Sequence, residues 1–300
     1  MQIVHFEVDS ELGKYLKGDK FEKSLNQFEN YTEFENVECI SIKIDSSADE
    51  KTLSNLPQLK LLITRTVGTD HIDINYCNKK GITVKNIPDY GAFNIAEHAF
   101  AMLLTGCRNI REIDKEIKNG KYSNTCHLGY ALKGKVLGVI GTGRIGLEMI
   151  KRAKGFEMEV SAFDIHKKEE FAKALGFEYI SLDKLLESSD IISLHAPLTP
   201  ETHHMIAEPQ ITKMKEGVIL INTARGGLID TQSLINNISK FRFLGLDVLE
   251  DENKFDKENP FLKYDKVLIT PHVAYYSDLS VKKIAQETEK IIEEFLLEKQ

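Results

Sequence analysis

The sequence predicts an α/β protein with two doubly wound, mainly parallel sheets. Short apolar runs alternate with helical patterns along the first third of the chain, and a second alternating series follows a polar segment. The second series opens at residues 135–146, KVLGVIGTGRIG, where a buried strand runs into a glycine-rich turn and a helix. With 300 residues, the chain fits one large domain or two modest ones that each bury a core.

The composition is typical of a globular protein and argues against several partners. Hydrophobic residues make up 42% of the chain and charged residues 28%. The net charge of −7 and the lack of a basic stripe argue against nucleic-acid binding. No apolar run approaches the ~18 residues that span a bilayer, and MQIVHFEVDS at the N-terminus does not resemble a signal peptide. The four cysteines lack C-x-x-C spacing, so we expect reduced thiols and a cytoplasmic protein.

The first series of elements ends in a long helix. Strands are expected at residues 3–6, 37–44, 59–64 and 82–85, with a polar helical stretch after the first strand. Residues 94–118 show one continuous helical pattern. Its first half is apolar on nearly every face, which favours burial, including burial at a subunit contact. Residues 120–134 are polar and contain glycine, so we expect a loop there.

The second series of strands begins at the glycine-rich turn. Strands are expected at residues 136–140, 159–163, 191–194, 218–222, 243–247 and 266–270. The polar run 250–259 is expected to be an exposed loop. A final helix at residues 278–298 follows the series, and we expect it to fold back onto the first domain.

Gly141, Gly143 and Gly146 match the dinucleotide-binding pattern G-x-G-x-x-G. The first glycine permits a tight turn, the second lets a pyrophosphate approach the backbone, and the third lets the helix pack closely on the strand. The N–H groups at the start of the helix would hold the phosphates. Asp164 ends the next strand, at about the 20-residue distance where an acid meets the adenosine ribose. The sequence therefore predicts a Rossmann domain.

Asp164 also favours NAD over NADP as the cofactor. A 2′-phosphate on the ribose would bring two negative charges together. At about 4 Å and an effective dielectric constant of about 20, this repulsion is of order 4 kcal/mol. Lys167 and Lys168 follow closely in the sequence and would reduce the repulsion, so the degree of NADP tolerance stays open.

Residues that follow the strands of the second series are candidates for chemistry, because ligands of open α/β sheets bind outside the carboxyl ends of the strands. They are Gly141, Asp164, His195, residues 223–225, residues 247–252 and His272. Arg225 suits a carboxylate, since its planar guanidinium donates two charge-assisted hydrogen bonds at once. Taken singly, Arg225 also fits a surface ion pair, His272 a structural histidine and Glu252 a solvated acid.

Together, Arg225, Glu252 and His272 form the set that the reduction of a 2-keto acid requires. A glutamate beside the histidine favours imidazolium and keeps a proton available near neutral pH. Hydride from a nicotinamide would attack the carbonyl carbon while His272 protonates the oxygen. Arg225 would hold the carboxylate and stabilise the charge that develops on the carbonyl. The sequence predicts no metal site.

The chain resembles the D-isomer-specific 2-hydroxyacid dehydrogenases, and within that family the D-lactate dehydrogenases. The similarity covers nearly the whole chain, with the motifs in the family's order and at compatible spacings. The motifs are RTVGTDHID at residues 65–73, NIAEHAFAMLL, VIGTGRIG, SLHAPLT, INTARGGLID, LGLDVLEDE and TPHVAYYS.

The resemblance implies that Arg225, Glu252 and His272 are the catalytic residues. Glu252 matches the family's acid better than Glu250, because that acid lies five residues after the aspartate that Asp247 matches. The implied substrate-binding residues are Val67, Gly68, Tyr90, Tyr275 and Tyr276, with the backbone amides of the first two at the substrate carboxylate. The implied cofactor-binding residues, for NAD, are Gly141, Gly143, Arg144, Ile145, Gly146, Asp164, His195, Pro197, Thr223, Ala224 and Asp247.

The resemblance also implies a flavodoxin-like substrate domain into which the Rossmann domain is inserted. The substrate domain would comprise residues 1–98 and a returning C-terminal helix, 274–300, and the NAD-binding domain residues 99–273. Closure over the cofactor would exclude water and bring Val67 and Gly68 to the nicotinamide. Relatives are usually homodimers through the nucleotide domain, so we expect a homodimer.

Aromatic residues favour pyruvate, or another short aliphatic 2-keto acid, as the substrate. Tyr275 and Tyr276 stand where many family members have small residues, and they would form an apolar wall. The two residues after Tyr90 differ from the Ser-Pro of many lactate enzymes, and Lys43 replaces an aromatic residue. The alternatives are therefore a hydroxypyruvate/glyoxylate reductase or a 3-phosphoglycerate dehydrogenase. From a different class, an NADH-sensing corepressor-like binding protein is the remaining alternative.

Overall fold

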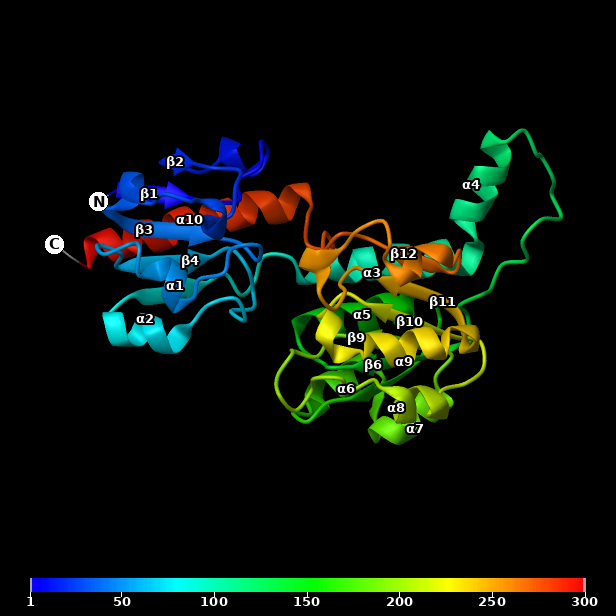
Figure 1. Ribbon diagram of the computed structural model, residues 1–300. Coiled ribbons are helices and arrows are strands. Elements are labelled where there is room, and N and C mark those ends of the chain that lie inside the picture. The colour runs from blue at the N-terminus through cyan, green and yellow to red at the C-terminus, as the bar shows by residue number, and fades with distance from the viewer. Residues whose placement is uncertain (1, 299–300) are drawn as a thin grey trace. The chain divides into compact units, whose positions relative to one another are not determined.

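The computed structural model describes residues 2–298, which form two compact units (Figure 1). One unit runs up to Gly91 and resumes at Tyr276, and the other comprises Ala92–Tyr275. Each contains one sheet whose strands are all paired in parallel and are joined by helices or short turns. The predicted α/β class with two parallel sheets is confirmed. Among the described residues, no helix is long and apolar enough to cross a membrane.

The first unit has a five-stranded sheet in the order β2-β1-β3-β4-β5, which is the flavodoxin-like order. Its strands are β1 (Gln2–His5), β2 (Asp19–Lys20), β3 (Val37–Ile42), β4 (Leu61–Thr64) and β5 (Thr83–Asn86). Its helices are α1 (Glu50–Leu53), α2 (Ile74–Lys80) and α10 (Asp278–Leu297). Helix α10 packs onto the sheet, because its Ile292 joins a buried cluster with Cys39, Leu61 and Ile63.

The prediction of a polar helical stretch after the first strand is wrong. Between β1 and β3 the chain forms the short edge strand β2 and three 3₁₀ turns, at Leu12–Lys14, Leu25–Gln27 and Thr32–Phe34. Phe21, Phe28 and Phe34 from this segment pack edge-on or stacked around the buried Phe6. On one helix Phe21 and Phe28 would share a face, but Phe34 would lie roughly 120° away. An irregular path is therefore what brings all three rings to one partner.

The second unit has a seven-stranded sheet in the order β12-β11-β10-β9-β6-β7-β8, the Rossmann order with one strand added at its end. Its strands are β6 (Val136–Ile140), β7 (Glu159–Phe163), β8 (Glu178–Tyr179), β9 (Ile191–Leu194), β10 (Val218–Asn222), β11 (Phe241–Leu246) and β12 (Val267–Ile269). Its helices are α3 (Ala92–Arg108), α4 (Ile110–Lys118), α5 (Arg144–Gly155), α6 (Glu169–Leu175), α7 (Leu182–Ser188), α8 (Glu208–Lys213) and α9 (Thr231–Asn236).

The single helix expected at residues 94–118 is broken in two. Asn109 separates α3 from α4 in the left-handed conformation, with φ of 52°, which asparagine tolerates better than most residues. The carbonyl of Cys107 accepts a hydrogen bond from Tyr130 N at 2.7 Å, so the loop that follows α4 returns to bind the C-terminal end of α3. Eight residues of α3 are buried, whereas α4 buries none.

The carboxyl ends of the second sheet's strands lie along one edge, because the strands are parallel. The order reverses between β6 and β9, and this switch point is where open α/β sheets bind ligands. Strands β9 and β10 are buried at every residue, so the side chains that follow them start from a rigid base.

Candidate active site

The glycine-rich turn after β6 has little room for side chains at two of its three glycines. Gly141 has φ of +93°, and a Cβ there would lie 2.7 Å from the backbone nitrogen of Ala196. A Cβ on Gly146 would lie 2.0 Å from the carbonyl oxygen of Gly141. A Cβ on Gly143 would meet no protein atom within 4 Å. The turn therefore packs α5 tightly onto β6 and leaves open space at Gly143, where a pyrophosphate would approach.

Asp164 closes this turn from the end of β7. Its carboxylate accepts hydrogen bonds from Thr142 N at 2.6 Å, from Thr142 Oγ1 at 2.9 Å and from His166 N at 2.8 Å. Partial burial acts to raise the pKa of Asp164, but these hydrogen bonds outweigh it and hold the pKa below its ordinary value. The carboxylate is therefore an anion that can accept further hydrogen bonds, which is what a ribose diol requires. Thr142 had not been singled out in the sequence, where only its place inside the glycine motif could have indicated it.

Two buried polar atoms at neighbouring strand ends have no hydrogen-bond partner among the described residues. They are Nδ1 of His195, after β9, and Oγ1 of Thr223, after β10. Burial lowers the pKa of His195 to about 4, so its ring is neutral, and Nε2 contacts Ser193 Oγ at 2.8 Å. Buried polar groups normally have partners. Together with the open space at Gly143 and the ionised Asp164, these atoms fit a dinucleotide with polar groups along this edge.

The loops after β11 and β12 bring Glu252 and His272 into contact. Glu252 Oε1 lies 2.9 Å from His272 Nδ1, and the two side chains are partly exposed. His272 has φ of 54°, an uncommon conformation for a residue with a side chain, and its backbone N–H donates to the carbonyl of Asp247 at 2.8 Å. The imidazole is thus oriented by a carboxylate on one side, which leaves Nε2 to face a reacting group.

Asp247 is buried, and its carboxylate is engaged by the loop that carries His272. It accepts hydrogen bonds from Thr270 Oγ1 at 2.5 Å, from Val273 N at 3.0 Å and from Ala274 N at 2.9 Å. His98 of α3 contacts the same Thr270 hydroxyl at 3.0 Å. The sequence placed Asp247 among the cofactor-binding residues, and this clamp on residues 270–274 is a contact that sequence reasoning missed.

Arg225 lies in the turn that follows β10, beside the loop that carries Glu252. Its Nη1 donates to the carbonyl of Ala224 at 2.8 Å, and its own carbonyl accepts from Asn222 Nδ2 at 2.9 Å. Because a Cβ on Gly226 would lie 2.0 Å from the carbonyl carbon of Leu249, this turn and the loop after β11 are in direct backbone contact. The arginine is therefore fixed to the same carboxyl edge as the Glu252–His272 pair. Pro197, another predicted site residue, is exposed after β9.

Most of the predicted substrate-binding residues belong to the first unit. Val67 is exposed after β4, and its carbonyl accepts from Asn86 Nδ2 at 2.7 Å, while that of Gly68 accepts from Thr66 Oγ1 at 2.5 Å. Tyr90 is buried, and its carbonyl accepts from a serine of α10. The two adjacent tyrosines lie on either side of the boundary between the units, Tyr275 in the second and Tyr276 in the first.

Lys43 lies after β3 in the first unit and is partly buried. Burial, and then the charge of Arg65, lower its pKa, although Asp9, Glu7 and Asp45 act in the opposite direction. Its backbone N–H donates to Glu7 Oε2 at 2.6 Å. The lysine therefore stands in a mixed set of charges instead of in open solvent.

Comparisons with known proteins agree with this architecture. Residues 100–274 match the family model described as the NAD-binding domain of D-isomer-specific 2-hydroxyacid dehydrogenases. The chain is 39% identical over 244 residues to a glyoxylate reductase of Korarchaeum cryptofilum, which covers 79% of this chain and 73% of that protein. It is also 39% identical over 252 residues to a D-3-phosphoglycerate dehydrogenase of Archaeoglobus fulgidus, which covers 83% of this chain but only 48% of that protein.

A solved structure shows the same likeness over nearly the full length. It is the D-lactate dehydrogenase from Aquifex aeolicus in complex with NAD and lactic acid, with a TM-score of 0.89 and 40% sequence identity. The match covers 98% of this chain and 95% of that one. The overall fold is therefore shared with this solved structure, while the names of the similar proteins differ in their substrate.

Proposed function

The chain belongs to the family of D-isomer-specific 2-hydroxyacid dehydrogenases, and from this premise we propose that it reduces pyruvate to D-lactate with NADH. The contact of 2.9 Å between Glu252 Oε1 and His272 Nδ1 carries the proposal, because it gives an imidazole at the carboxyl edge of the second sheet a fixed orientation and an anionic neighbour. Membership of the family makes the protein an NAD-dependent oxidoreductase of 2-hydroxy acids. The identity of the acid and the roles of individual residues are the proposal.

His272 is the proposed acid of the reduction. With Nδ1–H donating to Glu252, the proton on Nε2 of the imidazolium is the one available to the substrate's carbonyl oxygen. The negative charge of Glu252 stabilises the imidazolium until the proton leaves. When bound, reduced nicotinamide supplies the hydride to the carbonyl carbon. In the reverse direction, neutral His272 takes the proton from the hydroxyl group.

Arg225 is the proposed ligand of the substrate carboxylate. Its guanidinium is always charged, and its planar donors match two carboxylate oxygens or one carboxylate and one carbonyl oxygen. The same charge stabilises the oxygen of the substrate as negative charge develops on it. Asp247 acts as a positioning residue, because its carboxylate binds the Thr270 hydroxyl before His272 and the two backbone N–H groups that follow His272. The substrate-binding roles of Val67, Gly68, Tyr90, Tyr275 and Tyr276 stay predictions from the sequence.

Residues of the glycine-rich turn are proposed to hold the cofactor. The backbone of Gly143, Arg144 and Ile145 would face the pyrophosphate, and Asp164 would accept hydrogen bonds from the adenosine ribose. The exposed surroundings of Gly143 and the ionised state of Asp164 support these assignments. The unpartnered atoms of His195 and Thr223 are further polar groups for the cofactor or substrate.

A glyoxylate or hydroxypyruvate reductase is the second candidate. The chain is 39% identical to a glyoxylate reductase and 40% identical to a D-lactate dehydrogenase. Sequence identity alone therefore does not indicate which 2-keto acid is the substrate. Pyruvate is favoured by Tyr275 and Tyr276, whose rings suit a methyl group better than a hydroxyl or a hydrogen. An NADH-sensing binding protein would use the same turn and residues without turnover.

A steady-state panel of 2-keto acids tests the proposal. NADH oxidation would be measured with pyruvate, glyoxylate, hydroxypyruvate, 3-phosphohydroxypyruvate and 2-ketoisocaproate, and the products resolved by chiral chromatography. We expect the highest kcat/KM with pyruvate and a D product. Higher kcat/KM with glyoxylate or hydroxypyruvate would move the assignment to the second candidate. Tight NADH binding with no turnover of any acid would instead support the binding role.

A further inference from the structure

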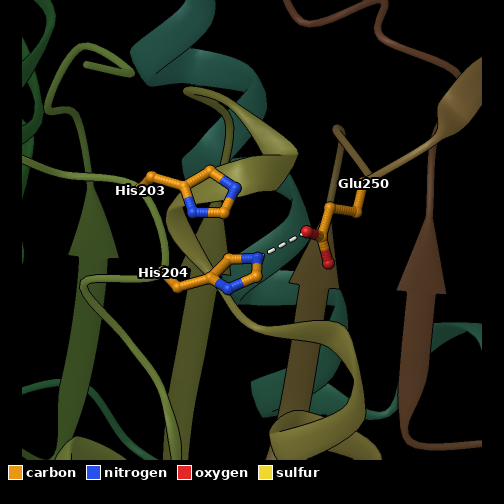
Figure 2. Close-up of side chains that lie close together, drawn as sticks. All are labelled: His203, His204 and Glu250. Carbon is orange, nitrogen blue, oxygen red and sulfur yellow. Dashed lines mark hydrogen bonds and ion pairs between the residues drawn. The ribbon is translucent and has the colours of Figure 1, made fainter. Parts of the chain in front are cut away.

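Two histidines and a glutamate gather in the second unit, outside the residues assigned above. His203 and His204 lie in the segment between β9 and α8, and Glu250 lies in the turn after β11. One nitrogen or oxygen atom from each of the three side chains lies within 4.8 Å of the others. Figure 2 shows the two imidazole rings one above the other, each with a nitrogen on the side that faces the Glu250 carboxylate. One side of the cluster therefore carries a nitrogen or oxygen atom from each of the three side chains.

The backbone, and not only side-chain reach, brings this cluster together. His204 has φ of 52°, and its N–H donates to the carbonyl of Gly227 at 2.8 Å. On the other side of the same turn, a Cβ on Gly226 would lie 2.3 Å from the backbone nitrogen of Glu250. The segments that carry His204 and Glu250 both pack against the turn that follows Arg225. These backbone contacts bring their side chains close together.

His204 stands between two carboxylates. Its Nε2 is 2.5 Å from Glu250 Oε1, and its Nδ1 is 3.6 Å from Asp230 Oδ2. A histidine that ligates a metal ion commonly presents its second ring nitrogen to a carboxylate, which fixes the ring and its tautomer. Asp230 is in the position to do this when Nε2 is the ligand atom. Asp230 is itself held by a hydrogen bond from Ser233 N at 2.7 Å.

We propose that His203, His204 and Glu250 bind a divalent cation of the zinc class, with Asp230 supporting His204. Two imidazole nitrogens and one carboxylate oxygen suit Zn²⁺ or a neighbouring transition metal, whereas Mg²⁺ and Ca²⁺ prefer oxygen ligands throughout. Tetrahedral ligands about 2.0–2.1 Å from zinc lie about 3.4 Å from one another, so the atoms of the cluster need to move by about 1 Å. Water from the solvent completes the coordination.

The rings of His203 and His204 are stacked, so one of them has to rotate before both can bind the same metal ion. The ring centroids are 3.8 Å apart and the ring planes differ by 28°. A ligating imidazole holds the metal ion in its own plane, so two nearly parallel rings have to open toward each other. His203 is exposed and free to turn about its side-chain bonds, whereas His204 is held by its two carboxylates. Rotation of the His203 ring away from the His204 ring would let one nitrogen from each histidine bind the ion.

Substitution of His203 distinguishes a metal site from an ordinary ion pair between His204 and Glu250. An ion pair between His204 and Glu250 needs no second imidazole, and it would be unchanged by the loss of His203. A zinc site with three protein ligands loses one of them with His203→Asn. Because the side chain is exposed, this substitution removes a ligand without leaving a cavity in the core.

Isothermal titration of the chelator-treated full-length chain with ZnCl₂ alone tests the proposal. For the wild type we expect saturable binding of one ion per chain. For His203→Asn and for Glu250→Gln we expect the affinity of that site to fall by at least about tenfold, the effect typical of losing even a supporting group of a metal site. Circular dichroism of each variant checks that the fold is retained. No cofactor or substrate is present, so the result does not depend on the proposed reaction.

His127→Asn is the matched control. His127 Nε2 lies 3.2 Å from Glu116 Oε1, which gives the second unit another histidine–glutamate pair but one without a second imidazole. We expect Zn²⁺ binding of this variant to equal that of the wild type. The proposal is overturned if the wild type shows no saturable site, if His203→Asn binds Zn²⁺ as tightly as the wild type, or if the control loses as much affinity.

Discussion

Proton transfer in the proposed reaction depends on one pair of side chains, Glu252 and His272. Replacement of His272 by Asn removes the acid, so we expect kcat to fall by about 10²–10⁴-fold, the usual contribution of a positioned acid. Glu252→Gln keeps a hydrogen-bond acceptor near Nδ1 but removes the charge, and should lower kcat by a smaller factor. Stopped-flow and steady-state kinetics give kcat, and fluorescence titration gives the NADH affinity, which we expect to stay unchanged. A comparable loss of NADH binding would place His272 in the cofactor site instead.

Asp164 is the residue that we expect to set the choice between NADH and NADPH. Asp164→Asn keeps an oxygen to accept from Thr142 and removes the negative charge that would oppose a 2′-phosphate. We expect the ratio of kcat/KM for NADH to that for NADPH to fall by at least about tenfold, well within the few kcal/mol of like-charge repulsion. Circular dichroism controls for the turn. An unchanged ratio would contradict the ribose assignment.

Single residues also show what spacing along the sequence can and cannot predict about contacts. Glu252 and His272 were found because each follows a parallel strand, and all such ends meet at one edge. The clamp of Asp247 on residues 270–274 was missed, since it depends on the path of a loop and not on spacing. The cluster around His204 was missed for the same reason: adjacent histidines have no characteristic metal-ligand spacing, and the third ligand lies 46 residues away.

At the scale of the elements, four strands of the second sheet were predicted with the bounds that the structure has, whereas the predicted bounds of the interior strands β3, β4 and β11 differ by up to two residues. Strands β6, β9 and β10 are almost entirely apolar, and β7 is buried between its two end residues, because both faces of the sheet are covered. The ends of these strands are therefore clear in the sequence. The errors fall where local pattern and tertiary contact disagree. Asn109 breaks a helix whose apolar repeat continues, and the segment before β3 follows the packing of its phenylalanines.

The turn between β6 and α5 offers a matched pair of glycine substitutions. Gly143→Ala adds a methyl group to open space at the start of the helix, so we expect the free energy of unfolding to fall by only about 0.5 kcal/mol. We expect NADH affinity to fall by at least about tenfold, because the methyl group occupies the space through which the pyrophosphate approaches the backbone. Gly146→Ala drives a methyl group against the carbonyl of Gly141 and should cost roughly 3 kcal/mol. Urea unfolding and NADH titration measure the two effects.

The pair separates a ligand contact from a packing contact. Equal loss of stability in the two variants would mean that Gly143 is packed against the protein after all. Normal NADH affinity in Gly143→Ala would mean that the phosphates lie elsewhere, and would leave the glycine pattern as a device for joining a helix to a strand.

For the molecule as a whole, buried neutral histidines make stability depend on pH. His5 is fully buried in β1; its Nδ1 is 2.6 Å from Ser41 Oγ and its Nε2 is 2.6 Å from the carbonyl of Lys17. Arg65 donates to the same serine hydroxyl, which leaves the hydroxyl proton to donate to Nδ1 and makes Nε2–H the donor to Lys17. Burial, and then the charge of Arg65, lower the pKa of His5 to about 4 from an ordinary value of 6.5. Between pH 6.5 and about 4 the ring is therefore neutral in the folded protein but protonated in the unfolded chain.

The sign of the pH effect follows from these two pKa values. Above pH 6.5 His5 is neutral in both states and contributes nothing to the dependence. Between pH 6.5 and about 4 only the unfolded chain binds the proton, so the free energy of unfolding falls as the pH falls, by up to about 3 kcal/mol from this residue. His195, whose pKa is also lowered to about 4, contributes with the same sign in the second unit.

His5→Gln isolates this contribution in the first unit. Glutamine retains a donor and an acceptor but does not titrate, so its variant should lose stability less steeply between pH 6.5 and 4.5, by a slope of up to about 1.4 kcal/mol per pH unit. Native-state hydrogen exchange of the β1 and β3 amides reports the opening of the first unit separately from that of the second. The slope is the decisive quantity, because the substitution also changes packing and shifts all stabilities of the variant by a constant. An identical slope in both proteins would mean that His5 is protonated in the fold, and the assignment of the Nε2–H tautomer would then be wrong.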